Sequence, residues 1–315
     1  MTTSRRAYTL ILAGMTFALS ACANGGAPPT PTPTGHLRLF VTNFAGGGAT
    51  SSLVAYVFPL SSGSAPNSTL TSSNGINGAR GLAFDFSDDL FVANSSNATV
   101  TAYLPPVGNS SVPALTITSG VGTPEDITFD FSLDLYVASL TGGSCGGTGY
   151  VALYTSPLSS TSVPAFTFCA GMNAPRGVVY DGASTIWVAN SGGNNVTAYA
   201  FPLSAASSPS ATLTSGVSTP YAVAIDGSGN LWVVNHGNNS VAVYSPPLTS
   251  ASTPAFTITN GINAPNYMTF GTNGTLYVAN ATNVTAYQPP FSSSSAPTLT
   301  IATGLNGPAG VAVGN

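Results

Sequence analysis

"YAVAIDGSGNLWVVNHGNNSVAVY", residues 221–244, consists of three short apolar runs separated by two polar stretches. The apolar runs are rich in valine, alanine and aromatic residues, and the polar stretches are made of Asp, Gly, Ser, Asn and His. Apolar runs bounded by turn-forming residues are typical of antiparallel β-strands. The stretch therefore predicts three consecutive strands joined by tight turns.

The central run of this stretch, LWVVN (231–235), has five further copies along the chain. They are LFVTN (39–43), LFVAN (90–94), LYVAS (135–139), IWVAN (186–190) and LYVAN (276–280). A run with a tyrosine follows each copy, and these tyrosines are Tyr56, Tyr103, Tyr154, Tyr199, Tyr244 and Tyr287. With a first and a fourth run, each unit has four predicted strands and a period of about 45 residues, the pattern of a β-propeller. We therefore expect an all-β, six-bladed β-propeller with four-stranded blades over residues 37–315, with the tyrosines packed between blades.

The repeat array is incomplete at both ends. It begins on a second strand, LRLFVTN (37–43), and it ends on an unpaired first strand, GPAGVAVGN (307–315). We expect the C-terminal strand to complete the N-terminal blade. This pairing would close the ring and remove sheet edges that invite aggregation.

The repeat resembles the NHL-type unit, and residues 221–244 are the copy closest to it. The resemblance covers residues 37–315 and implies a six-bladed propeller. It implies no single activity, because similar propellers include lyases, lactonases, RNA-binding modules and passive scaffolds. This chain departs from the family pattern by having Asn or Ser, where the family usually has Asp, after the second strand.

The first 36 residues predict export and lipid anchoring. Arg5 and Arg6 precede an apolar run that is short for a membrane span and ends in LSAC (19–22). LSAC resembles a bacterial lipobox, so we expect a signal peptide over residues 1–21 and lipidation of Cys22. Residues 22–36 would then be a Pro/Thr-rich tether, and the lipid would be the only membrane contact. General secretion and twin-arginine export both remain open, and the expected product is a monomeric protein of the bacterial cell envelope.

Composition argues against a nucleic-acid partner and against a disordered chain. Charged residues make up 4% of the chain, against about 25% in typical soluble domains. There is no lysine, and the formal net charge is −4. Nucleic acids are bound mainly through Lys and Arg, so we expect no nucleic-acid partner. The hydrophobic content of 43% excludes a disordered chain.

Most of the acidic residues are expected to stabilise turns. Asp85, Asp130, Asp181 and Asp226 each end a first strand. An Asp side chain at such a position accepts hydrogen bonds from backbone N–H groups about two residues further on. The Asn that ends most second strands is expected to serve the following turn in the same way.

One residue per blade can be aligned just before the first strand: Arg80, Glu125, Arg176, Tyr221, Asn266 and Ala309. The links between blades and the loops between second and third strands emerge on the same face of a propeller, so these residues should surround the mouth of the central channel. Two arginines and the only glutamate thus fall in successive blades, beside Asp126. We interpret them as a candidate site for a small polar or anionic ligand, with the arginines as forked donors. The alternative is a set of ion pairs that only ties blades together.

His236 occupies a turn position held elsewhere by Phe44, Ser95, Leu140, Ser191 and Ala281. The fold therefore does not demand a histidine there, and we expect a surface turn residue. Because its loop emerges on the mouth face, His236 also joins Tyr221 and Asn266 in the candidate ligand-binding set.

Cys145 and Cys169 both belong to the third repeat, at positions that map to the mouth face. Export permits a disulfide between them. We expect the bond to form and to stabilise the fold by roughly 3 kcal/mol.

Two hypotheses about function follow. The main one is a non-catalytic envelope lipoprotein whose propeller binds a small polar ligand or a protein partner at the channel mouth. The alternative is a metal-assisted lactonase or lyase at the same place. Glu125, Asp126 and Asn266 offer oxygen ligands that a hard cation such as calcium prefers, but two acids on one blade make a thin metal site. We therefore expect no cofactor, with calcium as the alternative.

Overall fold

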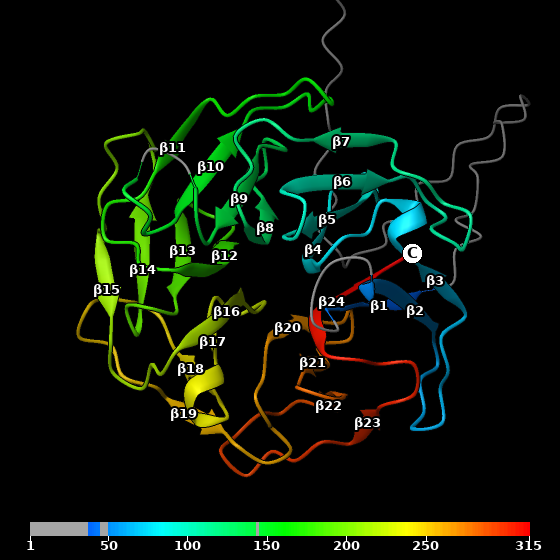
Figure 1. Ribbon diagram of the computed structural model, residues 1–315. Helices are drawn as coiled ribbons and strands as arrows, with labels where there is room; N and C mark the ends of the chain where they lie inside the picture. Colours follow the sequence, from blue (N-terminus) through cyan, green and yellow to red (C-terminus); the bar gives the residue numbers. More distant parts are fainter. Residues whose placement is uncertain (1–36, 45–49, 143–144) are drawn as a thin grey trace, which may run out of the picture. The chain divides into compact units, whose positions relative to one another are not determined.

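The computed structural model describes residues 37–44, 50–142 and 145–315. The predicted signal peptide, Cys22 and the tether lie outside the described residues. The described chain forms six four-stranded antiparallel sheets arranged in a ring (Figure 1), which confirms the predicted six-bladed propeller. No helix in the described ranges has the length and apolar character needed to span a bilayer.

The blades are numbered here from the N-terminus, and each is given from its inner to its outer strand. Blade 1 consists of β24 (Pro308–Gly314), β1 (Arg38–Asn43), β2 (Ser52–Val57) and β3 (Ser68–Leu70). Blade 2 consists of β4 (Ala79–Phe84), β5 (Leu90–Asn94), β6 (Thr99–Tyr103) and β7 (Leu115–Ile117). Blade 3 consists of β8 (Pro124–Phe129), β9 (Leu135–Ser139), β10 (Tyr150–Tyr154) and β11 (Phe166–Phe168). Blade 4 consists of β12 (Pro175–Tyr180), β13 (Thr185–Asn190), β14 (Asn195–Ala200) and β15 (Ala211–Leu213). Blade 5 consists of β16 (Pro220–Ile225), β17 (Leu231–Asn235), β18 (Ser240–Tyr244) and β19 (Phe256–Ile258). Blade 6 consists of β20 (Tyr267–Phe270), β21 (Leu276–Ala279), β22 (Val284–Tyr287) and β23 (Leu299–Ile301). Two short 3₁₀ turns, η2 (Ser72–Asn74) and η3 (His236–Asn238), lie between strands.

The ring closes as the sequence predicted. The C-terminal strand β24 pairs antiparallel with β1, with Val41 opposite Val311. Blade 1 is thus built from both ends of the array, and its inner strand is the last one in the chain.

The core lies between neighbouring blades, because each central strand is covered on both faces. All five residues of β17 are buried, with Trp232 and Val234 packing toward blade 6 and Leu231 and Val233 toward blade 4. Alternate residues of a strand point to opposite faces of the sheet. A strand sandwiched between two blades therefore needs apolar residues at every position, which explains the continuous runs in the sequence.

A tyrosine links each blade to the preceding one. The third-strand tyrosines are buried, as expected. Each hydroxyl donates a hydrogen bond of 2.6–2.8 Å to a backbone carbonyl in the link from the preceding blade. In the order of the tyrosines, the acceptors are the carbonyls of Thr303, Asn74, Ser119, Ala170, Ser215 and Asn260. The next residue of each link is a glycine in the left-handed region, with φ between 69° and 87°. A side chain there would collide with a proline of the next blade. These contacts set the spacing of the blades.

Loops protect the outer strands, whose free edges would otherwise be open to pairing with other chains. The backbone N–H of Thr69 donates to the Asn109 side chain of the next blade at 2.7 Å. Thr116 and Thr212 donate in the same way to serine hydroxyls of the blades that follow them.

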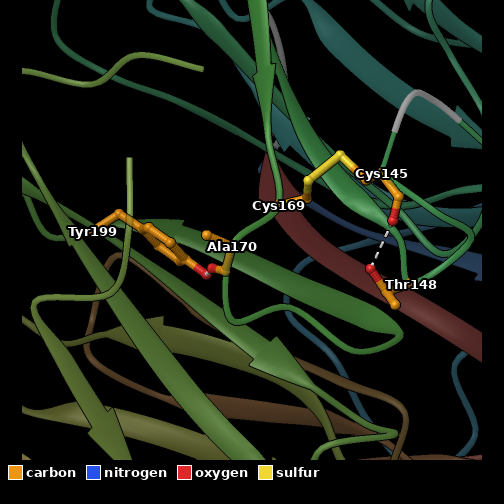
Figure 2. The surroundings of a disulfide bond; sticks show 5 residues. All are labelled: Cys145, Thr148, Cys169, Ala170 and Tyr199. Carbon is orange, nitrogen blue, oxygen red and sulfur yellow. Dashed lines mark hydrogen bonds between the residues drawn. A yellow bond between two sulfur atoms is a disulfide. The ribbon is translucent and has the colours of Figure 1, made fainter. Parts of the chain in front are cut away.

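The predicted disulfide is present. Cys145, in the loop after β9, is bonded to Cys169, at the end of β11, and their Cα atoms are 6.1 Å apart (Figure 2). Figure 2 also shows Ala170, whose carbonyl accepts the hydrogen bond from Tyr199 of blade 4. The bond therefore ties the long loop of blade 3 to the link that leads into blade 4.

Asp residues stabilise the turns as predicted, whereas the Asn residues that end second strands mainly hold the links between blades. In the turn after β16, for example, the Asp226 carboxylate accepts hydrogen bonds from the backbone of Ser228 and Asn230. The Asn residues that end second strands instead accept a bond of 2.9–3.3 Å from the link preceding the first strand of the same blade, in the pairs Asn43–Asn306, Asn94–Asn77, Asn190–Asn173, Asn235–Ser218 and Asn280–Asn263. Their Nδ2 groups also reach across the following turn, as from Asn190 to the Asn195 side chain at 2.9 Å, so only the predicted bond from the backbone of that turn was wrong. These amides hold the links that approach the channel mouth.

Candidate functional site

The residues aligned one per blade surround the mouth of the channel, and a β-bulge positions most of them. Arg176 lies between Pro175, opposite Asn190, and Gly177, opposite Ala189, so it has no partner across the strand pair. Register shifts include Arg80, Glu125, Tyr221 and Ala309 in the same way. A bulge adds one residue to a strand and redirects its side chain. The sequence alignment placed these residues just before the first strand, whereas these five lie within it.

Three charged side chains meet at this mouth. The Glu125 Oε2 atom is 2.6 Å from Nη1 of Arg176 and 3.8 Å from Nε of Arg80. The Glu125 side chain is buried, and each arginine side chain retains about a fifth of its surface. Burial lowers the pKa of Arg80, and the neighbouring Glu125 carboxylate opposes this effect. With both arginines protonated and Glu125 ionised, the trio carries one net positive charge in a protein that is otherwise acidic.

Aromatic faces hold the two guanidinium groups. The Arg80 guanidinium carbon lies 3.5 Å from the centre of the Phe44 ring, and that of Arg176 lies 4.3 Å from the centre of the Tyr221 ring. Such stacking orients a guanidinium while leaving its edge free to donate. The arginines are thus held in place before any ligand arrives.

His236 continues the stack on the other side of Tyr221. The two rings are nearly parallel, with centroids 4.1 Å apart. His236 Nδ1 lies 3.2 Å from the carbonyl oxygen of Pro265. A carbonyl only accepts hydrogen bonds, so Nδ1 is the donor in this contact. When the ring is neutral, its lone pair is therefore on Nε2.

A hydrogen bond across the channel forms the floor of the site. The Tyr267 hydroxyl of β20 donates to Oδ1 of Asp126 in β8. Blades 3 and 6 face each other in the ring of six (Figure 1), so this bond crosses the channel. Asp126 is fully buried and also accepts from the backbone N–H groups of Ile127 and Val178. Asp126 is therefore below the site rather than in it.

Asp126 should make the stability of the fold depend on pH. Burial raises its pKa to about 7, although its three hydrogen bonds oppose this. An Asp carboxyl has a pKa of about 3.9 in the unfolded chain. When its pKa is higher in the folded protein, its contribution to stability is complete below about pH 3.9 and is lost as the pH rises through the pKa of the folded state. We expect this group to lower the free energy of unfolding by up to about 1.4 kcal/mol per pH unit between about pH 4 and 7. Urea denaturation across this pH range should show that the free energy of unfolding depends less on pH for Asp126→Asn than for the wild type. An equal pH dependence of the two proteins would contradict the raised pKa of Asp126.

The arginines, Tyr221, His236 and Asn266 line one cavity of about 500 Å³. Its lining thus includes two arginines, an imidazole and the Asn266 side chain, whose Nδ2 donates to the Pro308 carbonyl at 2.7 Å. Donors of this kind suit an anionic or carbonyl-bearing ligand. The chemistry of the site thus favours a small acid derivative rather than a cation.

The donor set does not fit the calcium ion considered from the sequence. One oxygen of Glu125 faces two guanidinium groups, and both oxygens of Asp126 already accept hydrogen bonds below the mouth. Within the described ranges, no three His, Cys, Asp or Glu side chains gather into a group that could hold a metal ion.

The structure brings most of the residues predicted from sequence together around the mouth and adds two that were not predicted. Arg80, Glu125, Arg176, Tyr221, Asn266 and His236 do come together around the mouth, whereas Asp126 lies beneath it. The two residues that were not predicted are Phe44, which stacks on Arg80, and Tyr267, which donates to Asp126 across the channel. Phe44 had a signal, because it occupies the same turn position as His236. Tyr267 had one too, because the equivalent residue is Gly81, Gly177, Ala222 or Gly310 in four other blades.

Comparison with known proteins places the fold. No family model matches the chain, and no curated protein matches it. Among solved structures, a periplasmic gluconolactonase from Pseudomonas aeruginosa aligns with a TM-score of 0.58 and 17% identity, over 88% of this chain and 85% of that one. Two proteins whose names read "putative 6-phosphogluconolactonase" align at a TM-score of 0.60: one from Bacteroides uniformis, with 13% identity over 86% and 84% of the chains, and one from Bacteroides fragilis, with 12% identity over 91% and 100%.

These neighbours overturn the main expectation about function. The sequence favoured a non-catalytic scaffold because the chain is poor in titratable residues and holds one histidine in its repeats. The names of these neighbours count against this expectation and favour its alternative, an enzyme of lactonase type. At these identities the likeness shows the propeller fold alone.

Proposed function

We propose that the protein hydrolyses lactones of sugar acids that carry an anionic group, and that the channel mouth is its active site. The observation that carries the proposal is the single cavity that brings two supported arginines and a histidine together. The names of the structural neighbours support the reaction class.

Each residue has a role in the proposed reaction. Arg80 and Arg176 bind the phosphate or carboxylate of the substrate through paired N–H donors. His236 Nε2 accepts a proton from a water molecule as the water oxygen attacks the lactone carbonyl carbon. The ring C–O bond then breaks, and the proton passes from His236 to the leaving oxygen, which yields an open hydroxy acid. Glu125 acts as a positioning residue that holds both guanidinium groups.

The test measures ring opening of 6-phosphoglucono-δ-lactone by the purified protein. The release of acid is recorded, and its rate is compared with that of spontaneous hydrolysis. We expect acceleration that persists in EDTA, because the site offers no fitting metal ligands. His236→Ala should lower kcat by about 100-fold, the contribution of a general base, with a small change in KM. Ser191→Ala, at the equivalent position of blade 4, should retain full activity. Failure of the wild-type chain to exceed spontaneous hydrolysis of both the phosphorylated and the neutral lactone would refute the proposal.

We further propose that the chain is an exported, monomeric lipoprotein of the cell envelope with NHL-type repeats and no nucleic-acid partner. The signal-like N-terminus and the LSAC sequence support lipid anchoring at Cys22. The disulfide supports an oxidising compartment such as the periplasm, and one structural neighbour is periplasmic by name.

A further inference from the structure

A row of aromatic rings lies at the end of the propeller opposite the mouth. Phe86 follows β4, Phe131 follows β8 and Tyr180 ends β12, so the row crosses three blades. The Phe86 and Phe131 rings have centroids 6.2 Å apart and planes 23° apart, and Phe131 meets Tyr180 edge-on at 5.4 Å. The exposed fractions of Phe86 and Phe131 are 68% and 63%.

The turns themselves do not require these phenylalanines. Gly182, Gly227 and Thr272 occupy the equivalent position in blades 4 to 6. The large hydrophobic residues that are exposed in the described ranges, namely Phe86, Leu104, Val112, Phe131 and Val163, all belong to blades 2 and 3. Single exposed apolar residues are common, whereas two adjoining exposed rings form a contiguous apolar patch, a feature that interaction surfaces share.

The turns that carry the row are acidic: Asp88 is exposed, Asp85, Asp89, Asp134 and Asp181 are partly buried, and Asp130 is buried. Six of the nine acidic residues lie in these three turns: Asp85, Asp88, Asp89, Asp130, Asp134 and Asp181. The turns, at 85–90, 130–135 and 181–185, contain no basic residue. Burial, and then repulsion from Asp85 and Asp88, raises the pKa of Asp89. A partner that brings positive charge would relieve this repulsion.

We propose that the aromatic row is a docking surface for a protein segment in which arginine or lysine alternates with apolar side chains. The apolar side chains would cover Phe86 and Phe131, and the cations would lie over ring faces and beside the carboxylates. An anionic membrane is a poor alternative occupant, because the carboxylates would repel its headgroups. The proposal is independent of the lactonase activity, which belongs to the other end of the ring.

The test uses two labelled peptides, one alternating arginine with leucine and one alternating glutamate with leucine, titrated against the full chain by fluorescence polarisation. We expect the arginine peptide to bind, the glutamate peptide not to bind, and binding to weaken as salt rises. The double variant Phe86→Ser/Phe131→Ser should weaken binding by at least about tenfold. Val112→Ser/Val163→Ser, which removes exposed apolar residues of the same two blades outside the row, should bind as the wild type does.

Equal binding of the two peptides, or unchanged binding by the Phe86→Ser/Phe131→Ser variant, would overturn the proposal. Sedimentation with neutral phosphatidylcholine vesicles that depends on the two phenylalanines would overturn it in favour of a membrane-contacting surface. Circular dichroism should show that both double variants remain folded, because the substituted side chains are exposed.

Discussion

Replacing Gly310 with alanine is expected to destabilise the propeller by about 3 kcal/mol, the cost of overpacking a tight core. Gly310 lies in β24, the strand that closes the ring, and a Cβ atom there would come closer than 3.0 Å to the carbonyl oxygen of Arg80 and to Oγ1 of Thr42. The Arg80 contact is backbone of the neighbouring blade, so no side-chain rotation relieves it. The substitution strains the closing strand and the strand that carries Arg80 together.

Thermal unfolding followed by circular dichroism measures this effect. Gly227→Ala is the matched control, because a Cβ atom at Gly227 meets nothing within 4 Å. Its transition should fall close to that of the wild type, whereas that of Gly310→Ala should fall several degrees lower. Equal transitions for the two variants would show that the closing strand is not packed against blade 2 as described.

The second large effect is expected at Arg176. Arg176→Met should lower kcat/KM for 6-phosphoglucono-δ-lactone by about 100-fold or more, which corresponds to about 2.7 kcal/mol of transition-state binding. The guanidinium bonds to Glu125 at 2.6 Å and stacks on Tyr221. Its loss removes half of the proposed anion clamp and leaves Glu125 without its nearer partner. Arg176→Lys keeps the charge but loses the forked geometry and the stacking, so it should restore only part of the activity.

Comparing substrates separates anion binding from a general loss of structure. The neutral glucono-δ-lactone lacks the phosphate, so Arg176→Met should slow its hydrolysis much less. Arg38→Met is the control, because Arg38 donates to the Val107 carbonyl at the other end of the propeller. If Arg176→Met and the wild type hydrolyse the phosphorylated lactone equally, Arg176 does not bind the anionic group.

The local repeat made the fold predictable from sequence. Each blade pairs strands that follow one another in the chain, so alternating turns and apolar runs specify the pairing without any distant contact. Even the closing strand could be predicted, because the array begins and ends on incomplete blades. The disulfide was predictable for a related reason, since both cysteines lie in one repeat and map to one face.

The residues around the mouth were predictable from the sequence, but their contacts were not. Alignment of the repeats identified Arg80, Glu125 and Arg176 as neighbours around the mouth. It misjudged Asp126, the next residue after Glu125, because a bulge turns consecutive side chains in different directions, one into the mouth and one into the channel. It placed His236 in a turn at the mouth, but a turn position that tolerates five other residues gives no sign of the ring that stacks on Tyr221.

The sequence alone determined the strands, the number of blades and the place where the ring closes, because these depend on patterns repeated within about 45 residues. Only the tertiary structure decided which side chains meet. The bond between Tyr267 and Asp126 joins residues 141 positions apart, and Phe44 reaches Arg80 from another blade. Such contacts arise only when the ring brings every blade to a common axis, so they follow from closure rather than from any local pattern.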